Sequence, residues 1–213
     1  NADEFGLTEQ VNQGIIEAHQ KGVLTSTTFI VNMWSFEDAV ALANANPTLA
    51  TGLHLNLTDG APISNSEAVS SLVDTGGRFH HRGELLRRLI AGRIKSRDVR
   101  EELRAQIGKL HAAGISPTHL DSHQSTFMFP TLFRIVVELA AEHQLPIRLP
   151  QEQMMFHSTQ TLFRHLGSPR LWKKVAMWSI CEVMRRGLER RGIPTIRRVA
   201  STIGTFENTH NNS

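Results

Sequence analysis

The sequence predicts an α/β fold in which parallel strands form either an open sheet or a barrel. Short segments rich in β-branched residues alternate with helical segments, which is typical of strands joined by crossover helices. The 213 residues are 40% apolar and 20% charged, as in ordinary globular proteins. No internal repeat or low-complexity linker divides the chain, so we expect residues 1–206 to form a single domain and 207–213 a disordered tail.

The first part of the chain is expected to contain three strands and two helices. Thr8 is a suitable N-cap and Gly22 a suitable stop for the first helix, because apolar residues recur at helical spacing between them. The Asn46-Pro47 pair ends the second helix. The expected strands are 1–4, 25–33 and 50–57, and the expected helices lie between Thr8 and Gly22 and over 36–44.

A long loop over 58–82 precedes the second part, in which the alternation continues. Long loops in compact domains are often functional. Helical periodicity is strongest over 130–143, where apolar residues fall on one face. The expected helices are 83–92, 97–113, 130–143 and 159–191, and the expected strands are 116–121, 146–149 and 192–196.

Composition and charge argue against several classes of function. No apolar run approaches the ~20 residues of a membrane span, and the single cysteine, Cys181, is interpreted as a buried small hydrophobe. The net charge is +3, and the basic clusters at 87–100 and 185–198 are interpreted as solvated helix faces without aromatic residues for stacking on nucleic acid. We therefore expect a cytoplasmic protein with no nucleic-acid partner and no transmembrane segment, and the sequence is compatible with a homodimer.

Polar side chains concentrate where three of the expected strands end, which is where parallel α/β folds place their chemistry. The two-residue period of a strand puts His54 and Asn56 on one face, and likewise His119 and Asp121, with His123 just past the strand end. The polar residues at the three ends are Asp3, Glu4, His54, Asn56, His119, Asp121 and His123.

A carboxylate and two neutral imidazoles from these ends suit a divalent metal ion such as Zn²⁺, Ni²⁺, Mn²⁺ or Fe²⁺. Such a metal acidifies a coordinated water and polarises a carbonyl. Asp3 is placed to act as general base, and Asp121 or His119 is placed to orient a ligand. Alone, His54 and the pair Asp3 and Glu4 are each more often structural, and the run from His119 to His123 is as often structural as functional. Their joint occurrence favours a site. The other histidines lack this context and are expected at the surface: His19, His80, His81, His111, His143, His157, His165 and His210.

Four blocks of the sequence resemble the YdjC-like carbohydrate deacetylase family (ChbG/HpnK type). They are NADEFGLTEQVNQGIIEAH, GVLTSTTFIVNM, GLHLNLTDGAPIS and PTHLDSHQSTFMFP, in the family's order over about residues 1–150. The resemblance implies a TIM-like β/α barrel that is incomplete in this chain. It also implies removal of an N-acetyl group from an amino sugar with a divalent metal ion, Mg²⁺ or Zn²⁺ or another transition metal.

The resemblance also assigns roles to individual residues. The opening motif implies that Asp3 is the general base and Glu4 a metal ligand, and the histidine motifs imply that His54 and His123 complete the metal site. Arg148, at the end of the strand expected over 146–149, is a candidate for binding the sugar or the oxyanion, with a surface salt bridge as the alternative.

The chain departs from the family pattern in three ways. Glu4 stands where the family has a second Asp, Gln124 to Thr126 stand where many relatives have further histidines, and no His-Pro pair occurs. We therefore expect a domain truncated at both ends, with its general acid outside this chain. The expected substrate is an N-acetylated amino sugar, either a chitooligosaccharide or glycolipid-linked N-acetylglucosamine. The alternatives are a catalytically impaired sugar-binding protein and, less favoured by the motifs, a metal-dependent isomerase or aldolase on the same fold.

Overall fold

The computed structural model describes residues 1–149 and 169–196 of the chain. The chain divides into two compact units, Asn1–Arg148 and Leu149–Ser213. The second unit contains the helix α7 (Pro169–Glu189) and the short strand β6 (Thr195–Ile196). The expected tail over 207–213 lies outside the described residues, and the single domain over 1–206 stays a prediction.

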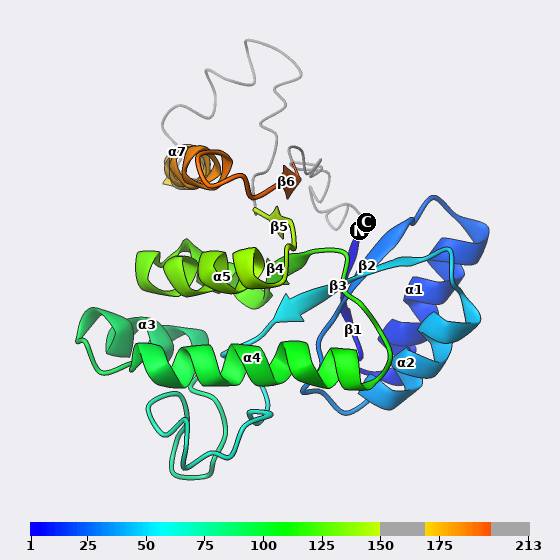
Figure 1. Ribbon diagram of the computed structural model, residues 1–213, viewed down its shortest axis with the longest axis horizontal. Helices are drawn as coiled ribbons and strands as arrows, with labels where there is room; N and C mark the ends of the chain where they lie inside the picture. Colours follow the sequence, from blue (N-terminus) through cyan, green and yellow to red (C-terminus); the bar gives the residue numbers. More distant parts are fainter. Residues whose placement is uncertain (150–168, 197–213) are drawn as a thin grey trace, which may run out of the picture. The chain divides into compact units, whose positions relative to one another are not determined.

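The first unit is built on five parallel strands that pair in the order in which they occur along the chain (Figure 1). This succession of neighbours is that of a β/α barrel, and among the described residues the strands do not close. The predicted fold class, an incomplete TIM-like β/α barrel, is confirmed. The strands are β1 (Ala2–Phe5), β2 (Ser26–Phe29), β3 (Ala50–Leu55), β4 (Leu120–Ser122) and β5 (Ile147–Arg148).

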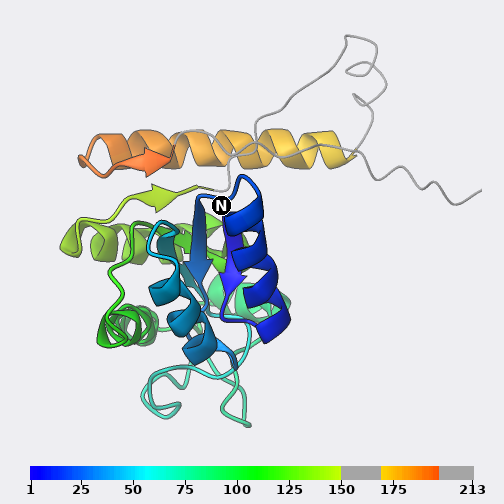
Figure 2. The same ribbon diagram turned by 90° about the vertical axis from the view of Figure 1, so that its right-hand side faces the viewer.

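Five helices accompany these strands, with α1 and α2 side by side and α4 and α5 side by side (Figure 2). The Thr8 hydroxyl accepts a hydrogen bond from the Val11 N–H and caps α1, as its sequence predicts. Pro130 occupies the first turn of α5, where its missing N–H costs nothing. The helices are α1 (Glu9–Lys21), α2 (Phe36–Ala45), α3 (Arg82–Ile90), α4 (Ser96–Ala112) and α5 (Pro130–Glu142), and the 3₁₀ segment η1 covers His123–Met128.

One apolar residue from each strand forms a continuous row across the sheet. The register pairs Phe5 with Phe29, Phe29 with Leu53, Leu53 with Leu120, and Leu120 with Ile147. All five side chains are completely buried. This row fixes the register of the sheet, because a slip by one residue would move every member to the other face.

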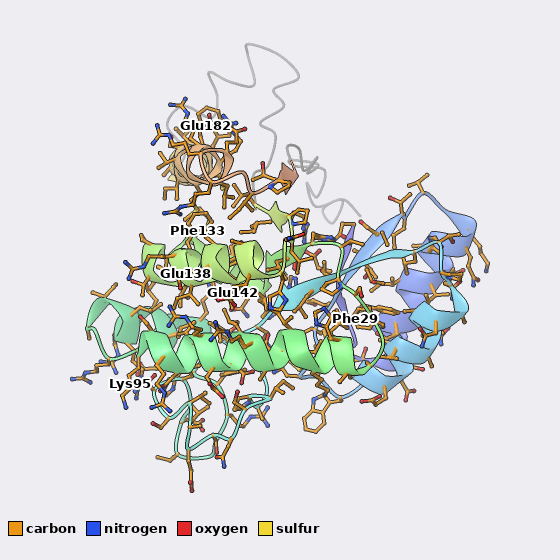
Figure 3. All side chains as sticks on the ribbon, in the orientation of Figure 1. Phe29, Lys95, Phe133, Glu138, Glu142 and Glu182 are labelled. Atoms are coloured by element: carbon orange, nitrogen blue, oxygen red, sulfur yellow. The ribbon has the colours of Figure 1, made fainter. Side chains whose placement is uncertain are left out.

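Helix α4 holds the long loop in place through buried polar side chains. The Glu102 carboxylate accepts hydrogen bonds from the backbone N–H groups of Ile63 (3.0 Å) and Ser64 (2.9 Å). Asp98 accepts from the N–H of Ser71 (3.1 Å), so two turns of α4 anchor two parts of the loop. On its exposed side α4 is joined to α5 by ion pairs to Glu138 and Glu142 (Figure 3).

Three sequence expectations need correction. The strand expected over 25–33 ends at Phe29, and the strand expected over 116–121 begins only at Leu120. Pro117 lacks the N–H that an earlier start would use. His80, expected at the surface, is buried, because the loop folds back on itself and the His80 N–H donates to the Leu72 carbonyl (3.0 Å). None of the described helices is long and apolar enough to cross a membrane.

We predict that Glu102→Ala lowers the free energy of unfolding by roughly 1–3 kcal/mol, because it leaves two partly buried backbone N–H groups and the buried Gln106 amide without this acceptor. Urea denaturation measures this change, and limited proteolysis should show earlier cleavage within 58–81. The control is Glu101→Ala, which removes an exposed carboxylate from the same helix. Equal stability of the two variants would contradict the anchoring role of Glu102.

Candidate active site

The register of the sheet places three polar side chains side by side. Because Leu53, Leu120 and Ile147 share one level, the residues that follow them also share a level: His54, Asp121 and Arg148. His54 Nδ1 lies 2.6 Å from Asp121 Oδ1, and Arg148 Nε donates to Asp121 Oδ2 at 2.9 Å. The apolar row on one face of the sheet therefore aligns a polar row on the other.

Burial and charge act against each other in this polar row. Burial raises the pKa of the Asp121 carboxyl, but His54 and Arg148 lower it, and the net pKa lies below the ordinary value. Burial lowers the pKa of the His54 imidazole, while the charge and hydrogen bond of Asp121 raise it, and the net pKa lies above the ordinary value. Asp121 is therefore an ionised carboxylate that makes His54 electron-rich.

The end of β1 is irregular, and this brings two adjacent carboxylates to the same site. The register with β2 shifts between Ala2 and Phe5, and Glu4 has a φ of 72°, in the left-handed region. Such a conformation costs a non-glycine residue on the order of 1–3 kcal/mol and is typical of functional positions. It lets Asp3 reach Arg148 while Glu4 Oε1 lies 3.2 Å from His123 Nδ1.

Each imidazole of the pair His54 and His123 is held by a carboxylate on one nitrogen. Asp121 bonds His54 Nδ1, and Asp59 Oδ2 lies 2.7 Å from His123 Nε2. An ionised carboxylate can only accept a hydrogen bond, so these two nitrogens carry the protons. In the neutral rings, His54 Nε2 and His123 Nδ1 are then acceptors, and they face each other at 3.2 Å.

Among the described residues, three acceptor atoms thus converge without a donor of their own: Glu4 Oε1, His54 Nε2 and His123 Nδ1. The three residues can present ligand atoms that all lie within 4.8 Å of one another. Atoms that bind one metal ion at about 2.0–2.2 Å lie roughly 3–3.6 Å apart, which matches the two separations of 3.2 Å. The chemistry and spacing of these atoms, which we call the acceptor cluster, fit a divalent metal ion.

A second carboxylate-rich group, Asp3, His54 and Asp121, also meets the geometric condition for a metal site. The negative charge of its two carboxylates is already balanced by Arg148, which donates hydrogen bonds to Asp3 and to Asp121. The guanidinium therefore takes the place that a cation would take there. Arg148 thus forms ion pairs with the predicted base, Asp3, and with the buried Asp121, and its own side chain is 15% exposed.

Among the described residues, no hydrogen bond joins His119 to the acceptor cluster, and its role in orienting a ligand stays a prediction. Its ring packs against Gly52, and its Nδ1 bonds the Thr118 hydroxyl at 2.9 Å. Within the described part of the chain, its Nε2 has no hydrogen-bond partner. Burial lowers the pKa of His119, which favours the neutral ring.

Sequence reasoning missed Asp59 and Gln124. Asp59 follows the end of β3, where an acidic residue could have been noticed by the same strand-end rule that selected His54. Gln124 donates to Asp59 Oδ2 at 3.0 Å from a left-handed conformation, φ 52°, which no periodicity reveals.

Comparison with known proteins finds a family match and relatives that are named as deacetylases. The family described as YdjC-like protein matches residues 1–212. The carbohydrate deacetylase of Brevibacillus brevis is 46% identical over 150 residues, which cover 70% of this chain and 58% of that protein. The chitooligosaccharide deacetylase of Yersinia enterocolitica is 38% identical over 172 residues, which cover 80% of this chain and 64% of that protein. The chain thus spans less than two thirds of the length of either relative.

A solved structure shares the fold. The crystal structure of a protein from Enterococcus faecalis V583, named for cellobiose-phosphate cleavage, superposes with a TM-score of 0.66 at 28% identity. The match covers 92% of this chain and 95% of that one.

We predict that Gly52→Ala destabilises the protein by roughly 1–3 kcal/mol through overpacking. A Cβ at this position would lie 2.5 Å from His119 Cε1, so the ring would have to move. In a His119→Ala background the same substitution should be neutral or slightly stabilising, because the ring is gone and alanine restricts the unfolded chain. Thermal unfolding of the four proteins of this double-mutant cycle measures the coupling, and additive effects would contradict the packing.

Proposed function

The chain belongs to the family of YdjC-like proteins, and we propose that it is a metal-dependent hydrolase that removes an N-acetyl group from an amino sugar. The observation that carries this proposal is the acceptor cluster, in which both histidines are fixed by carboxylates with their free nitrogens facing Glu4 and each other. The names of the two relatives support the reaction and the class of substrate.

Glu4, His54 and His123 would hold the metal ion. Two imidazoles and one carboxylate favour Zn²⁺ or another transition metal over Mg²⁺, which prefers oxygen ligands. When bound, the metal acts as a Lewis acid that polarises a carbonyl and acidifies a coordinated water. The carboxylate of Asp121 increases the ligand strength of His54 by accepting the proton on its other nitrogen.

Asp3 would act as the general base. The side chain is 43% exposed, so a water molecule can reach it. Within the described part of the chain, its hydrogen bonds to Asn1 and Arg148 both fall on Oδ1, which leaves Oδ2 to take a proton. Arg148 would hold this carboxylate in place, and direct contact of Arg148 with a sugar stays a prediction.

The proposed substrate is an N-acetylated amino sugar, a chitooligosaccharide or glycolipid-linked N-acetylglucosamine. The alternative is a catalytically impaired sugar-binding protein, because Glu4 reaches farther by one methylene than the Asp of the family motif. The strained backbone at Glu4 favours a working ligand, since strain of this kind persists where function requires it. The cytoplasmic location, the homodimer and the absence of a nucleic-acid partner stay predictions.

We predict that Glu4→Gln weakens Zn²⁺ binding by at least tenfold in the full-length protein, because a neutral amide is a poor ligand compared with a carboxylate. Glu4→Asp should retain binding, since it keeps the charge. Competition with a chromophoric chelator measures the affinities, and Glu9→Gln, an exposed change in the next helix, is the control. Equal affinity in the wild type and Glu4→Gln would remove Glu4 from the site.

We predict that Asp3→Asn lowers the rate of acetate release from N-acetylated chitooligosaccharides by roughly 10²–10⁴-fold, which is typical of a lost general base. Zn²⁺ affinity should change far less, because Asp3 lies outside the acceptor cluster. The assay uses the full-length protein. Metal binding without any acetate release by the wild type would favour the sugar-binding alternative.

A further inference from the structure

His123 takes its orientation from a residue outside the predicted ligand set. Asp59 Oδ2 accepts a hydrogen bond from His123 Nε2 at 2.7 Å, while His123 Nδ1 faces Glu4 and His54. The His123 side chain is about nine-tenths buried, and that of Asp59 is 44% exposed. Asp59 therefore stands at the border between solvent and the acceptor cluster.

A buried amide fixes the position of Asp59. Asn56 Oδ1 accepts hydrogen bonds from the backbone N–H groups of Thr58 (3.0 Å) and Asp59 (3.1 Å), and Asn56 Nδ2 donates to the Asp59 carbonyl (2.8 Å). Asn32 Nδ2 donates to the same carbonyl, also at 2.8 Å. Side chains from the segments that follow β2 and β3 thus bind the backbone of Asp59, and this fixes the position from which its carboxylate reaches His123.

Gln124 completes the arrangement from the other side. Its Nε2 donates to the same oxygen of Asp59 that accepts from His123. Gln124 and Ser125 both have left-handed backbone conformations, with φ of 52° and 56°. Two consecutive strained residues directly after His123 turn the chain sharply, and the turn brings the Gln124 amide back to Asp59.

We propose that Asp59 is a positioning residue that selects the tautomer of His123 protonated at Nε2, and thereby leaves Nδ1 free to bind the metal ion. This inference rests on the proposed metal site. Each histidine then has a carboxylate that accepts the proton of one ring nitrogen: Asp121 for His54 and Asp59 for His123. Asp121 is buried and also pairs with Arg148, whereas Asp59 is partly exposed. Of these two carboxylates, only that of Asp59 is open to solvent.

The choice of tautomer has a geometric consequence. With the proton on Nδ1, His123 would direct an N–H at Glu4 and His54 and could not serve as a ligand there. A carboxylate at Nε2 excludes this form because it accepts but cannot donate. Loss of such a support typically weakens metal affinity by roughly 10–100-fold.

The test measures Zn²⁺ affinity of the full-length protein by chelator competition for the wild type, Asp59→Ala, Asp59→Asn and Asp59→Glu. We expect about 10–100-fold weaker binding for Asp59→Ala, a smaller loss for Asp59→Asn, and recovery of most of the affinity in Asp59→Glu. The control is Glu67→Ala, which removes an exposed carboxylate from the same loop and should change the affinity less than about twofold. Thermal unfolding verifies that each variant is folded.

A second readout follows the tautomer directly. Long-range ¹H–¹⁵N correlation spectra of the metal-free protein should show His123 protonated at Nε2 in the wild type, and a mixture of tautomers in Asp59→Ala. Equal Zn²⁺ affinity in the wild type and a folded Asp59→Ala would overturn the role of Asp59 alone. Failure of the wild type to bind Zn²⁺ would overturn the proposed metal site and this inference together.

Discussion

A buried, ionised carboxylate, Asp121, is the constraint around which the site is arranged. A charge inside the sheet is costly unless it is paired and hydrogen-bonded, and Asp121 meets this requirement with His54 on one oxygen and Arg148 on the other. Replacement of such buried pairs by apolar residues is often neutral or stabilising, so the row gives no general advantage in stability. The row instead orients two groups of the site. Asp121 directs the free nitrogen of His54, and Arg148 positions the carboxylate of Asp3.

The parallel sheet explains how residues far apart in sequence reach this arrangement. The buried row from Phe5 to Ile147 sets one level across five strands, and on β3, β4 and β5 the polar residues one position later inherit that level. On β2 the next residue is the buried, apolar Ile30. On β1 the left-handed backbone of Glu4 directs its carboxylate to His123 while Asp3 reaches Arg148. Regular register thus builds the histidine and arginine part of the site, and a local distortion adds the acidic part.

The sequence allowed the prediction of what depends on periodicity and strand ends. Alternation along β3 identified His54, and the strand-end rule identified Glu4 and His123, which the structure brings together. His119 shares a face with Asp121, but a two-residue step along a strand spans roughly 6.6 Å, which moves its ring back over Gly52. Asp59 could not be foreseen in its role, because its position follows from the turn built by Asn56 and from the left-handed residues after His123. Neither the turn nor the left-handed residues produce a periodic pattern in the sequence from which they could be predicted.

Helix α4 connects the fold to the least regular part of the site. Gln106 donates to the backbone carbonyl of Asn56 at 2.6 Å and accepts from its N–H at 3.0 Å, which fixes the residue that forms the turn to Asp59. One helical turn earlier, Glu102 bonds Gln106 at 2.8 Å and holds the loop at Ile63 and Ser64. These polar side chains are completely buried, so their hydrogen bonds have no competition from water. These hydrogen bonds fix the turn that carries Asp59, just as the strand register fixes Asp121 beside His54. The proposed site requires each histidine in a single tautomer, so each needs a carboxylate in a fixed position beside it.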